Sequence, residues 1–186
     1  MTEPLIQILE TPNPDAYMFR INEMLIPSGT HEFKQGDPID LSPLASVILA
    51  IPSIELILIA PRFITVRKHT DATWQDLKQR VTQALELFLN SGEMAVFEQP
   101  KTAAHTNLTE LERQVLELLN EEVRPAIAMD GGDFVYHGIS EGIVKIELIG
   151  ACGSCPSSTA TLHNGIQNLL IEEFPQLKGV EQVHSS

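Results

Sequence analysis

The chain has 186 residues and a formal net charge of −13, from 12 basic and 25 acidic side chains. Nucleic acid and anionic membrane surfaces both require clustered Lys and Arg, so this charge argues against either as a partner. With 43% apolar residues, the length is sufficient for one or two domains that each bury an ordinary core.

The first half of the chain predicts the order strand, strand, short helix, hairpin, long helix. Apolar and polar positions alternate in its first run, as they do in a half-buried strand. Two β-rich runs further along are separated by Pro61 and Arg62, which indicates a hairpin. The expected strands are residues 5–10, 17–21, 54–60 and 63–68.

Two helices are expected in the same half. Ser42 is a suitable N-cap for a short helix, and Pro43 suits the first helical position because its missing N–H makes no intrahelical bond there. From Thr73 onwards, apolar residues recur at helical spacing and stop before Gly92. We expect this long helix to cover one face of the sheet.

Residues 46–60 are the most apolar stretch, but they contain Pro52 and Glu55 and are too few to cross a bilayer. The first residues show neither a basic segment followed by an apolar one nor an Arg- and Ser-rich transit sequence. We therefore expect a cytoplasmic protein, or one of an organelle matrix if a targeting segment has been removed.

Residues 93–107 lose all periodicity and consist mainly of small and polar side chains, which is typical of a flexible linker. The sequence therefore predicts a first domain over residues 1–92 and a second over 108–186. The expected fold class is α+β, with two small domains that each pack a small sheet against helices.

The second domain predicts a helix, a hairpin, a cysteine loop and a further helix. Thr109 and Glu112 have the spacing of a capping box, and Pro125 is expected to disturb the helix that follows them. A strand entered through Gly131 and Gly132 pairs with a second strand in residues 141–150. After the cysteines, apolar residues recur at core-facing helical positions up to Phe174.

Cys152 and Cys155 are the only cysteines, and they lie where a strand is expected to end and a helix to begin. The thiolate is the form that binds metal, and a helix N-terminus lowers the pKa of a thiol placed there. Positive side chains are scarce, because no Lys or Arg occurs between Lys145 and Lys178. This spacing favours metal or redox chemistry over a structural disulfide.

The number of ligands limits what these two thiols can do. Closed zinc sites and common iron–sulfur clusters take about four protein ligands. Either histidines complete the set, or two chains meet about a symmetry axis and each provides two sulfurs. His137 and His163 lack the spacing of common zinc modules, so the dimer is the simpler interpretation. It implies a shared, accessible site whose cluster exchanges readily.

Asp130, Gly131, Gly132 and Asp133 also resemble a site for a hard cation. A turn at the entry to the hairpin, with glycines at positive φ, explains this sequence more simply. We therefore interpret the motif as a turn.

The second half resembles the C-terminal domain of the NifU-type iron–sulfur scaffold proteins, the Nfu group. The resemblance lies in VRPAIAMDGGDF at residues 123–134 and in GIVKIELIGACGSCPSSTATLHNGIQNLL at residues 142–170. The first half resembles the Nfu N-terminal domain in TPNPDAYMF at 11–19, SPLASVILAIPSIELILI at 42–59 and FITVRK at 63–68. Together the two resemblances cover nearly the whole chain.

The resemblance implies an iron–sulfur cluster scaffold or carrier that is not an enzyme. Cys152 and Cys155 of two protomers would bind a bridging [4Fe–4S] cluster, with [2Fe–2S] as the alternative form. The loaded protein would be a homodimer that receives clusters from upstream assembly proteins and passes them to apoproteins. A thiol-disulfide oxidoreductase and a zinc-bridged dimer are the alternative functions.

Overall fold

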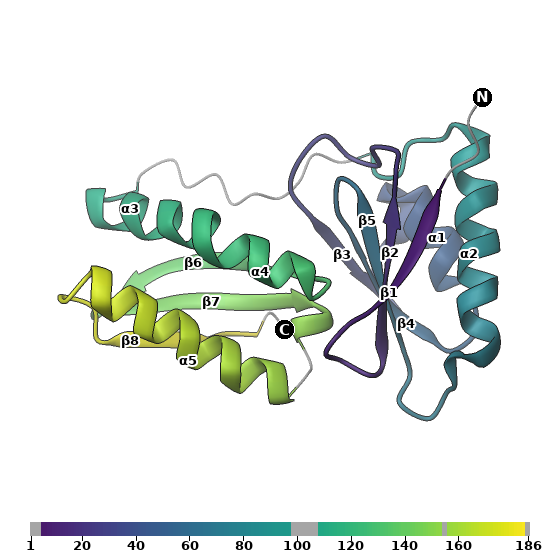
Figure 1. Ribbon diagram of the computed structural model, residues 1–186. Helices are drawn as coiled ribbons and strands as arrows, with labels where there is room; N and C mark the ends of the chain where they lie inside the picture. The colour runs from purple at the N-terminus through teal and green to yellow at the C-terminus, as the bar shows by residue number, and fades with distance from the viewer. Residues whose placement is uncertain (1–4, 98–107, 154–155, 185–186) are drawn as a thin grey trace. The chain divides into compact units, whose positions relative to one another are not determined.

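The computed structural model describes residues 5–97, 108–153 and 156–184, and the side chains of 154–162 are not described. The chain divides into two compact units, Met1–Lys101 and Thr102–Ser186. Each unit combines a sheet with helices, so the expected α+β class with two small layered domains is confirmed (Figure 1).

The first unit has a five-stranded antiparallel sheet in the order β1-β2-β5-β4-β3. The four strands expected from the sequence are all present. A fifth, β3, was not expected, because its four residues contain one buried apolar side chain, Phe33, and show no alternation. The strands are β1 (Ile6–Glu10), β2 (Ala16–Ile21), β3 (His31–Lys34), β4 (Ile54–Ile59) and β5 (Phe63–Lys68).

The helices α1 (Pro43–Leu49) and α2 (Trp74–Ser91) cover the same face of this sheet (Figure 1). The predicted ends of both helices are confirmed. Ser42 accepts a hydrogen bond from the Ala45 N–H, and Gly92 ends α2 in the left-handed conformation with φ of 71°. The buried side chains of α2 are Leu77, Val81, Leu85 and Phe88.

The structure describes the first five residues of the expected linker, 93–97, whereas residues 98–107 lie outside the described part. Ala95 and Val96 are buried in the core of the first unit. The carbonyl of Ala95 accepts a hydrogen bond from the Ser42 hydroxyl at 2.7 Å, and the Phe97 N–H donates to the Leu41 carbonyl at 2.7 Å. Residues 93–97 therefore belong structurally to the first unit.

The second unit has a three-stranded sheet in the order β6-β7-β8, with β6 and β7 antiparallel and β7 and β8 parallel. The hairpin of β6 and β7 was expected, whereas β8 was not. Because β8 follows α5 and pairs in parallel with β7, these elements form a β-α-β unit. The elements are α3 (Glu110–Leu118), α4 (Arg124–Met129), β6 (Gly132–Ser140), β7 (Ile143–Gly150), α5 (Pro156–Glu173) and β8 (Gly179–Gln182).

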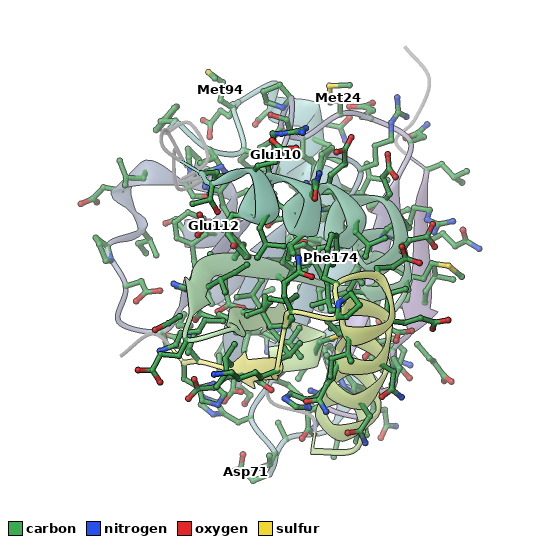
Figure 2. The ribbon with its side chains drawn as sticks, turned by 90° about the vertical axis from the view of Figure 1, so that its left-hand side faces the viewer. Met24, Asp71, Met94, Glu110, Glu112 and Phe174 are labelled. Carbon is green, nitrogen blue, oxygen red and sulfur yellow. The ribbon has the colours of Figure 1, made fainter. Side chains whose placement is uncertain are left out.

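The first helical segment of this unit begins at the predicted capping box. Thr109 accepts from the Glu112 N–H at 3.3 Å, and the Glu112 carboxylate accepts from the Thr109 N–H at 2.9 Å. Glu110 and Glu112 lie in the first turn of α3, and their side chains extend from it (Figure 2). Their negative charges lie near the positive end of the helix dipole, which stabilises the helix.

Pro125 disturbs the helix without ending it. A π-helical turn, Leu119–Val123, joins α3 to α4, and α4 continues to Met129. In a regular α-helix the ring of Pro125 would clash with the carbonyl of Glu121, four residues earlier. Glu121 lies inside the π turn, where the helix is wider. The widened turn thus absorbs the clash, and the chain stays helical from α3 through α4.

One core holds the second unit together. Side chains of α3, α4 and α5 pack against one face of the sheet, so the core combines helical and alternating strand positions. The core includes Val115, Ile127, Phe134, Val144, Ile146, Leu148, Cys152, Ile166 and Leu170.

Among the described residues, no helix combines the length and apolar character needed to cross a bilayer.

We predict that Ser42→Ala destabilises the first unit by about 2 kcal/mol, because the substitution removes the helix cap and leaves the buried Ala95 carbonyl without its donor. Urea unfolding followed by tryptophan fluorescence of Trp74 measures the change. Ser46→Ala, within the same helix, should change stability by less than about 0.5 kcal/mol. Equal effects of the two substitutions would contradict this role of Ser42.

A second prediction concerns Asp130, the residue that ends α4. Burial raises the pKa of its carboxyl above the ordinary value, so the folded chain holds this proton more tightly than the unfolded chain does. The contribution of Asp130 to stability is therefore fully present below the carboxyl range and is lost as pH rises through it. Asp130→Asn should raise the urea midpoint at neutral pH, and the gain should vanish in acid.

Glu122→Gln, which removes an exposed carboxylate from the preceding helical segment, is the matched control. An identical pH trend in the two variants would show that general charge reduction, and not burial of Asp130, causes the effect.

Candidate functional site

The cysteine loop lies at the carboxyl end of β7. Gly150 ends the strand with φ of 72°, and a single 3-10 turn, Ala151–Gly153, follows. The Ala151 N–H donates to the Gly131 carbonyl at 3.2 Å, which ties the loop to the turn before β6. In β-α-β units ligands commonly bind at the carboxyl ends of strands, and this loop occupies that position.

Cys152 is buried. Only 1% of its surface is exposed, and its sulfur belongs to the core of the second unit. A Cβ atom added to Gly132 would lie 2.7 Å from Cys152 Sγ and 2.9 Å from the Ile149 carbonyl oxygen. The sulfur thus occupies space that exists because residue 132 has no side chain. A cluster shared by two chains predicts an accessible site, whereas the structure buries Cys152.

Cys155 lies outside the described residues, so the pairing of Cys152 with Cys155 as ligands stays a prediction. The structure does place the start of α5 at Pro156, directly after Cys155. Backbone N–H groups of a helix's first turn are not used within the helix and favour negative charge nearby. This position suits thiolates, as the sequence argument expected.

The Asp130 to Asp133 motif is a turn, as predicted, but its two glycines have different causes. Gly131 has φ of 77°, which is the positive value expected for the hairpin entry. Gly132 has no positive φ, and what requires glycine there is the close approach of Cys152 Sγ and the Ile149 carbonyl oxygen. The expectation that turn geometry explains both glycines is therefore wrong for Gly132. No signal along the chain reveals this contact, because it joins residues 20 positions apart.

Asp133 is a structural carboxylate. It is buried, and both of its oxygens lie 2.7 Å from Arg124 Nη1. The Arg124 guanidinium also lies over the Phe134 ring, at 4.3 Å from its centre. The pair fixes α4 to the first residues of β6, beside the cysteine loop. This engagement supports the turn interpretation over a cation site.

The two histidines considered as ligands have other partners. His137 Nε2 lies 3.0 Å from a carboxylate oxygen of Glu147. His163 donates from Nε2 to the Val180 carbonyl at 2.7 Å, which ties α5 to β8. Among the described residues, no group of three or more His, Cys, Asp or Glu side chains could hold a metal ion.

Two family models match the chain. The model "Scaffold protein Nfu/NifU N terminal" matches residues 6–92, and the model "NifU-like domain" matches residues 115–181. The second match contains the cysteine loop and the turn that packs against it.

Curated relatives match along almost the entire chain. A protein of Drosophila ananassae named "NFU1 iron-sulfur cluster scaffold homolog, mitochondrial" is 36% identical over 183 residues, 96% of this chain and 64% of its own length. "NifU-like protein 5, mitochondrial" of Arabidopsis thaliana is 36% identical over 184 residues, 95% of this chain and 67% of its own length. The chain therefore spans about two thirds of the length of these relatives.

Solved structures match more loosely. A NifU-like protein of Saccharomyces cerevisiae is 29% identical with a TM-score of 0.47, over 52% of this chain and 87% of that one. A Staphylococcus aureus protein is 21% identical with a TM-score of 0.40, over 45% of this chain and 99% of that one. The two family models match in order along the sequence, and the two curated relatives match along nearly all of it. The chain therefore belongs to the Nfu family of NifU-like proteins.

Proposed function

We propose that this chain is an iron–sulfur cluster scaffold and carrier, in which Cys152 and Cys155 of two protomers hold one [4Fe–4S] cluster between them. The observation that carries the proposal is the Cys-x-x-Cys loop at the carboxyl end of β7, inside the region that matches the NifU-like domain. The Drosophila relative is named as an iron–sulfur cluster scaffold, which supports the same role here.

The count of sulfurs supports a shared cluster. A [4Fe–4S] cluster commonly takes four thiolates, and this chain has two cysteines. His137 and His163 are engaged with Glu147 and the Val180 carbonyl, so both would have to give up these partners to serve as ligands. A second copy of the chain provides the missing pair without such a rearrangement, and a twofold axis through the cluster would relate the two loops.

Weak charge compensation supports a cluster that is passed on. Within the second unit, Arg124 is engaged with Asp133, and Lys145 lies 3.8 Å from a Glu181 carboxylate oxygen. The thiolates of a recipient apoprotein would replace those of the carrier one at a time, by ligand exchange. The acidic chain would steer towards basic surfaces on recipients and on upstream assembly proteins.

Two observations bear on the thiol-disulfide oxidoreductase alternative, one in its favour and one against it. The order predicted from the sequence (helix, hairpin, cysteine loop, helix) contains no β-α-β unit, which is the setting expected for a redox-active Cys-x-x-Cys. The structure corrects this order, because β7, α5 and β8 form such a unit. A redox-active dithiol, however, needs an exposed attacking thiolate, and Cys152 is 1% exposed. The burial of Cys152 therefore disfavours this sulfur as the attacking thiolate of an oxidoreductase.

The names of the relatives bear on the cellular compartment in which the chain acts. Both curated relatives described above are named as mitochondrial proteins. We accordingly propose an organelle matrix or the cytoplasm as the site of action, since both keep thiols reduced and available for metal.

Anaerobic reconstitution with iron and sulfide tests the proposal. The wild-type chain should become brown and bind about two irons per chain, since four irons are shared by two chains. Cys152→Ser and Cys155→Ser should each bind less than about a tenth of that iron, because a hydroxyl is a poor replacement for a thiolate. His137→Ala should load like the wild type, since this histidine is not a ligand.

Other results would identify the alternatives. A colourless dimer with about half a zinc per chain would favour the zinc-bridged form. A monomer that reduces disulfides and takes up no iron would favour the oxidoreductase. Full iron loading of Cys152→Ser would show that the ligand assignment is wrong.

A further inference from the structure

Gly132 and Cys152 lie in close contact at the end of the hairpin formed by β6 and β7. Gly132 begins β6 and pairs with Gly150, the last residue of β7. Any Cβ at position 132 would lie 2.7 Å from Cys152 Sγ and 2.9 Å from the Ile149 carbonyl oxygen, distances that real Cβ atoms essentially never adopt. Cys152 Sγ therefore fits at this position only because residue 132 has no side chain. We call the space beside Gly132 that the sulfur occupies the Gly132 niche.

The niche holds the sulfur inside the core. Cys152 is 1% exposed and shares a core with Phe134 and Leu148 from the two adjacent strands. The hydrogen bond from the Ala151 N–H to the Gly131 carbonyl holds the turn in this position. A buried thiol behaves as a small apolar side chain and reacts slowly.

A sulfur in this position cannot at the same time touch material shared with a second chain. A cluster between two protomers must reach the sulfur from outside, and 1% exposure leaves no such approach. Loading therefore requires the turn Ala151–Gly153 to move Cys152 Sγ out of the niche.

We infer that Gly132 is a positioning residue that acts on the cluster ligand: its niche stores the Cys152 sulfur in the cluster-free chain and so favours release of the cluster. This inference rests on the proposed function. The niche stabilises the cluster-free form alone, so its free energy is subtracted from that of cluster binding. A carrier that must give up its cargo gains from such a competing position for one of its ligands.

The first test needs no change at Gly132. In the Cys155→Ser chain Cys152 is the only thiol, and its alkylation by iodoacetamide is followed by mass spectrometry without cluster. We expect the native chain to react about a hundredfold more slowly than the same chain unfolded in urea, because reaction requires local opening. Rates within about threefold of each other would overturn the inference, since the sulfur would then be accessible without leaving any niche.

The second test fills the niche. Gly132→Ala should speed alkylation of Cys152 at least about tenfold in the Cys155→Ser background. With both cysteines present, it should also slow the loss of a loaded cluster to an iron chelator about tenfold, because the sulfur has lost its competing position. Unchanged or faster cluster loss would overturn the inference.

Two controls separate positioning from general destabilisation. Gly165→Ala adds a Cβ in the same unit at a position where, among the described residues, nothing outside the glycine's own stretch of helix lies within 4 Å, so neither rate should change. Ile166→Ala creates a cavity in the same core without adding an atom at residue 132, and it should not slow cluster loss. If Ile166→Ala slows cluster loss as much as Gly132→Ala, the effect is not specific to the niche and the inference fails. If Gly132→Ala does not fold, the alkylation test on the unsubstituted niche still decides.

The inference and the proposed function fail in different ways. A wild-type chain that binds iron while its Cys152 thiol is fully reactive refutes the niche and leaves the carrier intact. A wild-type chain that binds no iron refutes the carrier, and with it the role of the niche in release, however slowly the thiol reacts.

Discussion

The close contact between Cys152 and Gly132 determines the geometry of the second unit around its functional loop. The contact brings the end of β7 against the start of β6, and the bond from Ala151 to the Gly131 carbonyl lies beside it. Asp133, one residue further along β6, binds Arg124 and so fixes α4 to the same corner. A short motif of two glycines and an aspartate thereby links the hairpin, a helix and the cysteine loop.

Much of this architecture follows from local sequence. Ser42 with Pro43, Thr109 with Glu112, and Gly92 are helix-end signals whose chemistry acts within one turn, and the structure has helix ends at all three. The alternating residues of β6 and β7 likewise predict a hairpin with one buried face, because the strand period is fixed at two.

What the sequence does not reveal depends on contacts between distant residues. The strands β3 and β8 have four residues each, too few for an alternating pattern, and each is recognised only through its partner strand. The reason for Gly132 lies 20 residues away, at Cys152. The cysteine pair is visible in the sequence, but the burial of Cys152 is not, because a Cys-x-x-Cys pattern specifies spacing and not exposure.

The burial of Cys152 and the proposed carrier role are compatible if the loop has two states. In the cluster-free state the sulfur is part of the core, protected from oxidation and from unwanted metal. In the loaded state the same sulfur would face a second chain. The difference in free energy between these states would set how firmly the cluster is held, so retention would depend on core packing as well as on the iron–sulfur bonds.

The central claim is that two chains share one cluster, and native mass spectrometry of the anaerobically loaded protein tests it most directly. The account predicts a species with the mass of two chains plus one [4Fe–4S] cluster, which loses the cluster when it separates into single chains. A single chain that carries a complete cluster would contradict the account.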